Sequence, residues 1–370
     1  MKKKLLVFHN ALAPYRVDFF NALHDKYAAN FYFELQNVSD QKFDQDNIKR
    51  KCSFTCNYLE KGFGLFGRTI RFGIINAINR HKPDIIFCNE YSPVTLVVFI
   101  YTKLFKPNIK VYTLSDDSIM QSIDRKGIRS ILRSIVTKNI EGVIFTSNEV
   151  SNWYYENISK KTKTLELPII HNEEKIRLNY SKSIEVANQN IKKYELSNNK
   201  ILLFIGRLVE VKNIDFLIKA VSKIQENNFK LIIVGEGELR DKLEDLVISL
   251  NLSSKIIFIG RKEEEELYNW YVFSQVFILP SIYEPYGAVI NEALIGGCHI
   301  LCSDHAGAAS LIDKSNGQLF NPENEAELVE KIQNTLKNIK PLEGEVKFLR
   351  DNKMPFTFQE MIQQFFLKLE

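Results

Sequence analysis

The sequence has few cysteines and no long apolar run. Its five cysteines are an odd number, and most lie in apolar, strand-like stretches, which favours reduced thiols in a cytosolic protein over a disulfide framework. Their C-x-x-x-C spacing also differs from the usual C-x-x-C zinc knuckle. The uncharged apolar run over residues 91–102 is well short of the ~20 residues that a bilayer crossing needs. The apolar stretch after the first lysines ends at Phe8, which predicts a first β-strand rather than a signal peptide.

Positive charge is concentrated in the first half. Residues 1–170 hold 25 Lys+Arg against 16 Asp+Glu, a net +9, and the remainder holds 24 against 29, a net −5. No nucleic-acid module or aromatic–basic interleaving accompanies this charge, so no nucleic-acid partner is expected. Arg125, Arg129 and Arg133 recur at i, i+4 and i+8 among isoleucines and a leucine. This pattern predicts a basic amphipathic helix, suited to a peripheral position on an anionic membrane surface, although an ordinary surface helix explains it as well.

Short apolar, β-branched runs alternate with helical patterns along the whole chain. Near-continuous hydrophobic strands separated by helices are typical of parallel sheets covered on both faces. We therefore predict an α/β protein with two doubly wound, Rossmann-like domains. The expected strands are residues 4–10, 31–37, 54–60, 84–90, 110–117 and 142–148 in the first half and 200–206, 230–237, 255–261, 275–281, 299–304 and 317–320 in the second.

The domain boundary is expected in the polar stretch 168–199, which carries few large apolar residues. This places a first domain at 1–170 and a second at 171–355. The amphipathic segment 356–370 is a candidate helix that returns to pack on the first domain. Because ligands of open parallel sheets bind beyond the carboxyl ends of the strands, two such domains would face a central cleft.

Gly62, Gly64 and Gly67 form a G-x-G-x-x-G spacing. A dinucleotide-binding loop requires a strand before it, a helix after it and an acid at the end of the next strand. The apolar run 52–60, a helical pattern over 68–81 and Glu90 could supply these elements. This strand–loop–helix unit comes third in the chain, and Phe63 crowds its loop. A surface turn is therefore the main interpretation, and a dinucleotide-dependent oxidoreductase is the minor alternative.

The D-x-D at 44–46 formally matches a metal site. A solvated turn is the simpler interpretation.

The second half places basic side chains at the end of a strand. Gly206 and Arg207 follow the run 200–205, and Lys212 comes shortly before a helical pattern. A planar guanidinium and a compact ammonium near a helix start favour a diphosphate. Two solvated basic residues in a loop are the alternative.

Two carboxylates follow a later strand of the same half. Glu284 and Glu292 have an E-x(7)-E spacing across a Pro-Tyr-Gly turn into a helix. Carboxylates facing one cleft accept hydrogen bonds from the hydroxyls of a sugar or ribose. A structural helix cap would explain either residue, but not both together with the basic pair.

The stretches "GRLVEVKN", "VGEGEL" and "LPSIYEPYGAVINEAL" resemble the donor-domain motifs of the family 4 retaining glycosyltransferases, which have the GT-B fold. The resemblance is specific over most of residues 200–320. In the first half it rests on strand order and on "APYRVDFFNAL", which is similar to a first loop and helix of bacterial members.

The resemblance implies a role for each motif residue. Arg207 and Lys212 would neutralise the departing diphosphate in place of a metal ion. The backbone N–H groups of Tyr286, Gly287 and Ala288 would assist them at the helix start.

The other donor-side roles fall to the acids and to one further loop. Glu284 would orient the donor sugar, Glu292 would hold the ribose, and Arg261 would line the base. No cofactor and no metal are expected beside the nucleotide-sugar donor, for which a UDP-sugar is the first choice.

The first half departs from the family pattern in two places. The first loop is not glycine-rich, so Arg16 would supply its charge unless the loop stays clear of the phosphates. Where many members have a His, this chain has Ser115 followed by Asp116 and Asp117, and we assign the missing role to Asp116 or to backbone. Without a compelling nucleophile we expect same-face attack assisted by the leaving phosphate. Acceptor-side contacts are expected from Tyr15, Arg16, Phe63 and Arg68.

These features predict a retaining glycosyltransferase of cell-surface polysaccharide synthesis, lipopolysaccharide or capsule, acting in the cytoplasm or at the inner face of the membrane. Its acceptor would be a glycan or a polyprenyl-diphosphate-linked sugar. A GT-B sugar-nucleotide epimerase and a catalytically silent sugar-nucleotide binder are the alternatives. Base, sugar and linkage depend on pocket shape rather than on motifs.

Overall fold

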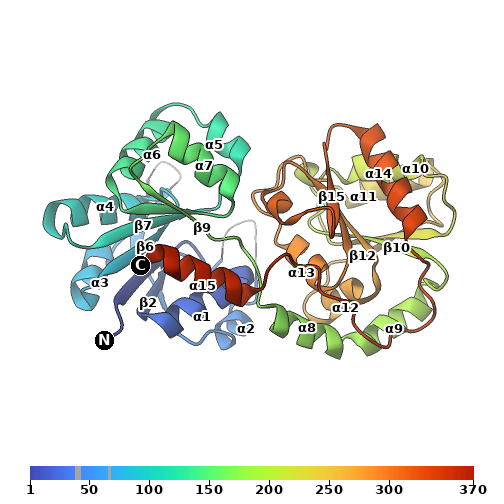
Figure 1. Cartoon of the computed structure of the whole chain (residues 1–370), viewed down its shortest axis with the longest axis horizontal. Helices are drawn as coiled ribbons and strands as arrows, with labels where there is room; N and C mark the ends of the chain where they lie inside the picture. The colour runs from blue at the N-terminus through green and yellow to red at the C-terminus, as the bar shows by residue number, and fades with distance from the viewer. Residues whose placement is uncertain (38–42, 66–67) are drawn as a thin grey trace. The chain divides into compact units, whose positions relative to one another are not determined.

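A computed structural model describes residues 1–37, 43–65 and 68–370. The chain divides into two compact units (Figure 1). Unit 1 comprises Met1–Ile169 and Gln359–Glu370, and unit 2 comprises Ile170–Phe358. Each is an open parallel sheet with helices on both faces, so the predicted pair of doubly wound α/β domains is confirmed.

Unit 1 contains a parallel sheet of order β3-β2-β1-β6-β7-β8-β9. The interior strands are almost wholly buried because helices cover both faces. The strands are β1 (Lys4–His9), β2 (Ala28–Phe33), β3 (Cys56–Tyr58), β6 (Ile85–Asn89), β7 (Lys110–Ser115), β8 (Gly142–Phe145) and β9 (Lys163–Glu166). The helices are η1 (Pro14–Arg16), α1 (Val17–Lys26), α2 (Gln45–Arg50), α3 (Ile74–His81), α4 (Pro93–Phe105), α5 (Ile119–Asp124), α6 (Ile128–Asn139) and α7 (Asn148–Asn157).

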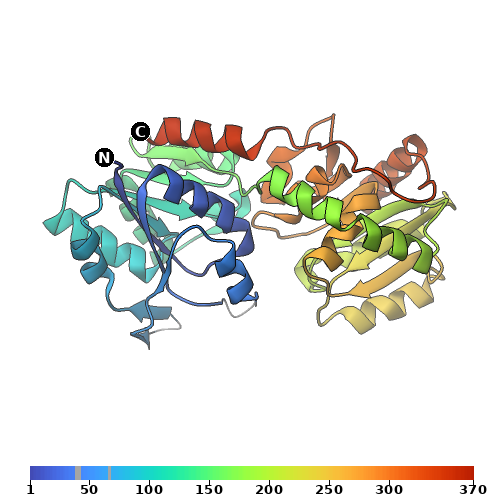
Figure 2. The same cartoon turned by 90° about the horizontal axis from the view of Figure 1, so that it is seen from below.

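The C-terminal helix α15 (Phe358–Leu369) packs on unit 1, where it lies beside α1 (Figures 1 and 2). The ring of Phe365 meets that of Phe19 edge-on with centroids 5.7 Å apart. Lys26 and Glu370 form an ion pair of 2.9 Å at the end of the same contact. The last residues thus complete the core of the unit that the chain builds first.

Unit 2 contains a parallel sheet of order β12-β11-β10-β13-β14-β15. The strands are β10 (Lys200–Ile205), β11 (Phe229–Val234), β12 (Ile256–Gly260), β13 (Val276–Leu279), β14 (His299–Ser303) and β15 (Gly317–Phe320), all where the apolar runs predicted them. The helices are α8 (Glu173–Lys182), α9 (Ile184–Lys193), η2 (Glu210–Lys212), α10 (Ile214–Ser222), α11 (Arg240–Ser249), α12 (Glu265–Phe273), α13 (Val289–Ile295), η3 (Gly307–Leu311) and α14 (Glu325–Asn338).

The polar stretch expected to hold the boundary forms two successive helices, α8 and α9 (Figure 2). They pack on α12. Tyr180 of α8 is fully buried, with its ring 5.9 Å from that of Tyr271 and 5.6 Å from that of Tyr268. A few aromatic and aliphatic anchors therefore dock helices whose average composition is polar.

The dinucleotide-loop alternative is wrong for the G-x-G-x-x-G segment. β4 (Gly62–Leu65) and β5 (Arg68–Arg71) pair antiparallel, and the helix predicted over 68–81 begins only at Ile74. A side chain at Gly62 would place its Cβ 2.2 Å from the carbonyl oxygen of Ile70, so this glycine serves the strand pairing. Gly67 lies outside the described residues. The expected strand at 31–37 is also shifted, since β2 ends at Phe33.

Candidate functional site

The main candidate site lies at the switch point of the unit 2 sheet. β10 is flanked by β11 on one side and β13 on the other, so the loops after β10 and β13 leave the carboxyl edge in opposite directions. Such a point is where open α/β sheets bind their ligands. Gly206 and Arg207 directly follow β10, Lys212 ends the short helix η2, and Glu284 lies in the loop after β13.

Two glycines fix the loop that carries Arg207. A Cβ on Gly235, whose φ is 151°, would lie 1.8 Å from the carbonyl oxygen of Gly206. A Cβ on Gly237 would lie 2.3 Å from that of Leu208. No side chain fits at either glycine, because the loop after β11 packs backbone to backbone against the loop after β10.

Lys212 and Glu284 form an ion pair within this site. Both side chains are largely buried, whereas Arg207 is exposed and makes no ion pair or hydrogen bond among the described residues. An ammonium group has three N–H donors, so Lys212 can keep Glu284 and still bind an oxyanion. The site thus presents the oriented ammonium group of Lys212 and, from the same loop, the exposed guanidinium of Arg207.

Glu292 of α13 is held by residues that the sequence analysis missed. The hydroxyl of Tyr271 donates to Oε2 of Glu292 at 2.6 Å, and Nε2 of His171 lies 3.6 Å from Oε1. The hydroxyl of Tyr180 donates to the backbone oxygen of Glu292 at 2.8 Å. Burial, and then the charge of Glu292, raise the pKa of Tyr271 and of Tyr180 well above the usual value. Both phenols therefore stay protonated donors, and the carboxylate keeps a fixed orientation.

The remaining donor-side residues lie around the start of α13 and the end of β12. Gly287 adopts a φ of 94°, which permits the turn into α13. No side chain of the described residues caps α13 at Ala288, and the ring of Tyr286 is buried. Arg261 directly follows β12 and is exposed, in an ion pair with Glu263. The roles expected for these residues remain predictions.

At the carboxyl edge of the unit 1 sheet, Arg16 is paired with Asp116. Arg16 is 2% exposed, so its guanidinium balances the carboxylate of Asp116 instead of facing solvent. The positive charge that Arg16 was predicted to bring to the first loop therefore acts in its contact with Asp116. Asp116 and Tyr15 both line a cavity of about 140 Å³ at the ends of β1 and β6. Phe63 is exposed on β4 and is not among the cavity residues, and the side chain of Arg68 lies outside the described part.

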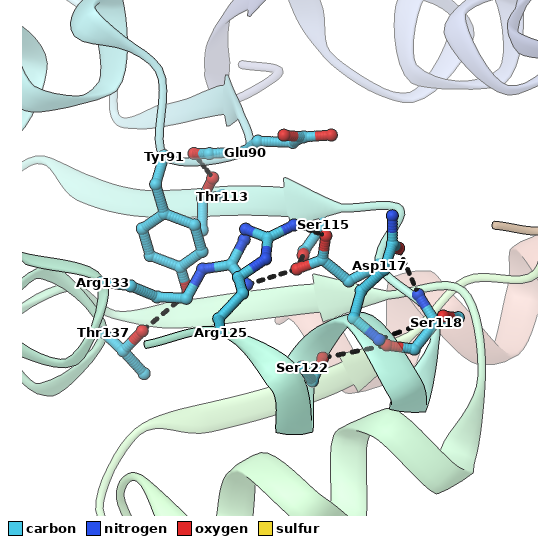
Figure 3. A network of polar contacts seen from close by, with 11 residues as sticks. Glu90, Tyr91, Thr113, Ser115, Asp117, Ser118, Ser122, Arg125, Arg133 and Thr137 are labelled. Carbon is cyan, nitrogen blue, oxygen red and sulfur yellow. Dashed lines mark hydrogen bonds and ion pairs between the residues drawn. The ribbon is translucent and has the colours of Figure 1, made fainter. Parts of the chain in front are cut away.

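Asp117 lies at the centre of a buried network (Figure 3). It forms ion pairs with Arg125 and Arg133, and the hydroxyl of Ser115 donates to its Oδ2 at 3.0 Å. The guanidinium of Arg133 lies 4.3 Å from the ring centre of Tyr91. Ser115, which stands where the resemblance expects a His, is thus a fully buried structural hydroxyl.

The prediction of one basic amphipathic helix through Arg125 and Arg133 is wrong. Gly127, with a φ of 78°, separates α5 from α6, so Arg125 precedes the helix that carries Arg133. Arg133 is 5% exposed, because the buried carboxylate of Asp117 requires an opposite charge. The exposed positions of α6 instead include apolar residues, namely Ile131, Leu132 and Ile135. The side chain of Arg129 lies outside the described part.

The acidic D-x-D stretch is a helix start. The side chain of Asp44 accepts hydrogen bonds from the backbone N–H groups of Asp46 and Asn47 and caps α2. Across the described ranges, no cluster of three or more His, Cys, Asp and Glu residues could hold a metal ion. Among the helices in those ranges, none combines the length and apolar character that a bilayer crossing requires.

Comparison with solved structures defines the fold. The crystal structure of a glycosyltransferase from Rickettsia africae superposes on 100% of this chain and 98% of its own with a TM-score of 0.70, at 18% sequence identity. Such structural neighbours have the GT-B fold. The fold is therefore GT-B, as predicted.

Comparison of sequences relates most of unit 2 to a known family. Residues 186–344 match the family described as glycosyl transferases group 1. An uncharacterized glycosyltransferase of Methanocaldococcus jannaschii is 36% identical over 40% of this chain and 36% of its own length. The N-acetylgalactosamine-N,N'-diacetylbacillosaminyl-diphospho-undecaprenol 4-alpha-N-acetylgalactosaminyltransferase of Campylobacter jejuni is 32% identical over 38% of this chain and 39% of its own. The matched segment thus spans less than half the length of both relatives. The predicted relationship to glycosyltransferases is confirmed, and residues 186–344, less than half of the chain, are the part that matches the group 1 glycosyl transferases.

Proposed function

We propose that the protein is a glycosyltransferase that moves a sugar from a nucleotide-sugar donor, a UDP-sugar in the first instance, to a glycan or lipid-linked acceptor of a cell-surface polysaccharide. The observation that carries this proposal is the grouping of Arg207, Lys212 and Glu284 at the switch point of unit 2, within the matched segment. Guanidinium and ammonium groups suit a diphosphate, and a carboxylate suits sugar hydroxyls. The name of the Campylobacter relative, which contains a diphospho-undecaprenol-linked sugar, supports the class of acceptor.

The proposed reaction retains the anomeric configuration by attack on the face from which the diphosphate departs. Arg207 and Lys212 would stabilise the charge on the leaving diphosphate, which removes the need for a metal ion or other cofactor. Glu284, fixed by its ion pair with Lys212, would accept hydrogen bonds from the donor sugar. Asp116 is paired with Arg16, and Asp117 with two arginines, which supports roles in orientation rather than as nucleophiles.

Product analysis tests the proposal against its alternatives. The protein would be incubated with UDP-sugars, a polyprenyl-diphosphate-linked sugar and EDTA. A transferase releases UDP and forms a glycoside whose anomeric configuration, read by NMR, matches that of the donor. Arg207→Ala should lower that turnover by about 10²–10³-fold, the range known for lost oxyanion donors. A changed sugar without a glycoside would identify an epimerase, and an unchanged donor that still binds would identify a silent binder.

We also propose peripheral attachment of unit 1 to the cytoplasmic face of an anionic membrane. Ile131, Leu132 and Ile135 are exposed on α6, and residues 1–170 carry the net positive charge. Apolar side chains that insert at the interface, together with basic charge, favour anionic lipid. The protein should cosediment with phosphatidylglycerol vesicles, and serine at the three α6 positions should abolish this. Equal cosedimentation of the triple variant would contradict the proposed attachment.

A further inference from the structure

Two of the five cysteines lie in one turn at the edge of the unit 1 sheet. Cys52 follows the end of α2, and Cys56 is the first residue of β3, the strand at one edge of the described sheet. Both residues are half-buried, whereas Cys88, Cys298 and Cys302 are fully buried. The proposed transfer reaction uses neither Cys52 nor Cys56, so this pair is available for a different chemistry.

The turn between the two cysteines is anchored to its surroundings. The ring of Phe54 is buried, with its centre 4.0 Å from that of Phe31 in β2. Oδ1 of Asn21 accepts hydrogen bonds from the backbone N–H and the hydroxyl of Ser53, at 2.7 and 2.9 Å. Cys56 is itself paired with Phe31 in the sheet. Because the backbone is held at each of these points, the two thiols stay in hydrogen-bond contact with each other.

The contacts of the two sulfurs give them different roles. Sγ of Cys52 lies 3.4 Å from the carbonyl oxygen of Ile48, which can only accept, so Cys52 keeps its proton. Lys49 lies on the face of Cys56, since its Nζ is 5.1 Å from the ring centre of Tyr58 and residues two apart in a strand share a face. The hydrogen bond from Cys52, and then the charge of Lys49, lower the pKa of Cys56 against the effect of burial. The same hydrogen bond, and then burial, raise the pKa of Cys52. Cys56 is therefore the sulfur that ionises first, and the thiolate is the nucleophilic form.

We propose that Cys52 and Cys56 form a redox-active dithiol, in which Cys56 attacks a small-molecule disulfide and Cys52 resolves the product into an intramolecular disulfide. With oxidised glutathione, the thiolate of Cys56 bonds to one sulfur and displaces a first glutathione thiolate. Cys52 then gives up its proton and bonds to the sulfur of Cys56, which displaces the second glutathione thiolate. The two leaving thiolates take up the two protons that the cysteines lose, and the small disulfide is reduced by two electrons.

The new bond joins the end of α2 to the start of β3. It removes the thiol hydrogen that Cys52 directs at Ile48, in the last turn of α2. In the first turn of the same helix, Nε2 of Gln45 donates to the carbonyl oxygen of Leu12 at 3.1 Å, in the loop after β1. The disulfide thus acts on a helix that contacts the first loop of unit 1. In a reducing cytosol such a bond is transient, which is typical of redox sensing rather than of a structural cross-link.

The test is mass spectrometry of the full chain after treatment with oxidised glutathione, followed by denaturation and alkylation. Trypsin cleaves after lysine, so the peptide 52–61 contains both Cys52 and Cys56 and no other cysteine. We expect this peptide to lack alkyl groups and to be lighter by two hydrogens than its reduced, unalkylated form. Dithiothreitol should restore both alkylation sites. Cys88, Cys298 and Cys302 are internal controls and should be alkylated throughout, because burial protects them from exchange in the folded protein.

Single variants test the order of the two steps. Cys52→Ser should stop at a mixed disulfide between glutathione and Cys56, whereas Cys56→Ser should leave Cys52 unmodified over the same time. Lys49→Met should slow the reaction several-fold, because the ammonium that favours the Cys56 thiolate is lost. Lys106→Met, at an exposed lysine of the same unit, is the matched control and should react like the wild type.

The inference is overturned if the 52–61 peptide stays fully alkylated after treatment, or if it retains glutathione in place of the intramolecular bond. Equally fast formation of the mixed disulfide in Cys56→Ser and Cys52→Ser would refute the assigned roles. Equal rates in Lys49→Met and the wild type would refute the role of Lys49. None of these results depends on nucleotide binding or sugar transfer, so the dithiol and the proposed function are tested separately.

Discussion

Replacing Glu34 by glutamine should remove a pH-dependent loss of stability. Glu34 directly follows β2 and is 9% exposed. Burial raises its pKa from 4.5 to about 7, although the charge of Arg71 and the hydroxyl of Ser92 act in the opposite direction. The folded state therefore keeps a proton that the unfolded state releases, and the free energy of unfolding falls as pH rises between about 4.5 and 7.

The size of this effect follows from the shift. Each pKa unit corresponds to about 1.4 kcal/mol, so the shift of Glu34 destabilises the folded state by at most about 3.5 kcal/mol above pH 7. Glu90, with a pKa of about 6, adds a smaller cost of the same sign. Glutamine is neutral at every pH and keeps the shape of the protonated acid. We therefore expect Glu34→Gln to gain stability over the wild type at pH 8 and to gain little at pH 5.

Urea unfolding at pH 5 and pH 8 measures the difference. Trp153 in unit 1 and Trp270 in unit 2 report on the two units by fluorescence, and the Glu34 effect should be confined to the transition of unit 1. Glu60→Gln, a substitution at an exposed glutamate of the same unit, is the control. A Glu34→Gln protein that loses as much stability between pH 5 and pH 8 as the wild type would refute the reasoning.

Two further substitutions test the packing around the sites, each against a matched control. Gly237→Ala should destabilise unit 2 and weaken nucleotide binding, because its Cβ would lie 2.3 Å from the carbonyl oxygen of Leu208, whereas Gly64→Ala meets nothing within 4 Å and should change neither. Thermal unfolding with and without UDP measures both, and equal behaviour of the two alanine variants would contradict this account. Arg133→Met leaves a buried carboxylate without one of its partners and should cost about 3–5 kcal/mol, while Arg125→Met, at a side chain that is 35% exposed, should cost about 1 kcal/mol or less. Urea unfolding measures the free energy of unfolding of both variants. If Arg133→Met lost no more stability than Arg125→Met, the charge of Arg133 would not be needed to balance Asp117.

The strands of unit 2 were predictable because their signal is local. Each is a short run of buried apolar residues, and the loops that carry Arg207 and Glu284 follow directly from those runs. Once the strand order was given, the switch point placed both residues at one edge. The local sequence therefore contained most of the candidate donor site.

The remaining features depend on contacts between distant residues. α8 and α9 are polar on average, and their docking depends on anchors such as Tyr180. The contact of Tyr271 with Glu292 joins α12 to α13 and leaves no periodic signal. Arg133 was wrongly predicted to be exposed, because basic residues at helical spacing usually lie on a solvent-facing helix face. In the structure it pairs with the buried carboxylate of Asp117.

The hairpin β4–β5 was missed for a related reason. The spacing of its glycines matches a dinucleotide-binding loop. Their structure is set instead by the antiparallel pairing of β4 with β5, which the spacing of glycines does not reveal. The fold of unit 1 was thus predictable at the level of its sheet, and less so in the connections that leave it.

The central claim is that unit 2 binds a nucleoside diphosphate through Arg207 and Lys212. The most direct test is the thermal stability of the full chain with UDP, GDP, ADP or NAD, for the wild type, Arg207→Ala and a control, Arg240→Ala, whose arginine is engaged by Glu236 and Glu244. One nucleoside diphosphate at 100 times its dissociation constant should add about 2.7 kcal/mol, and this gain should vanish in Arg207→Ala and persist in Arg240→Ala. Stabilisation by NAD alone, kept in Arg207→Ala, would contradict the account.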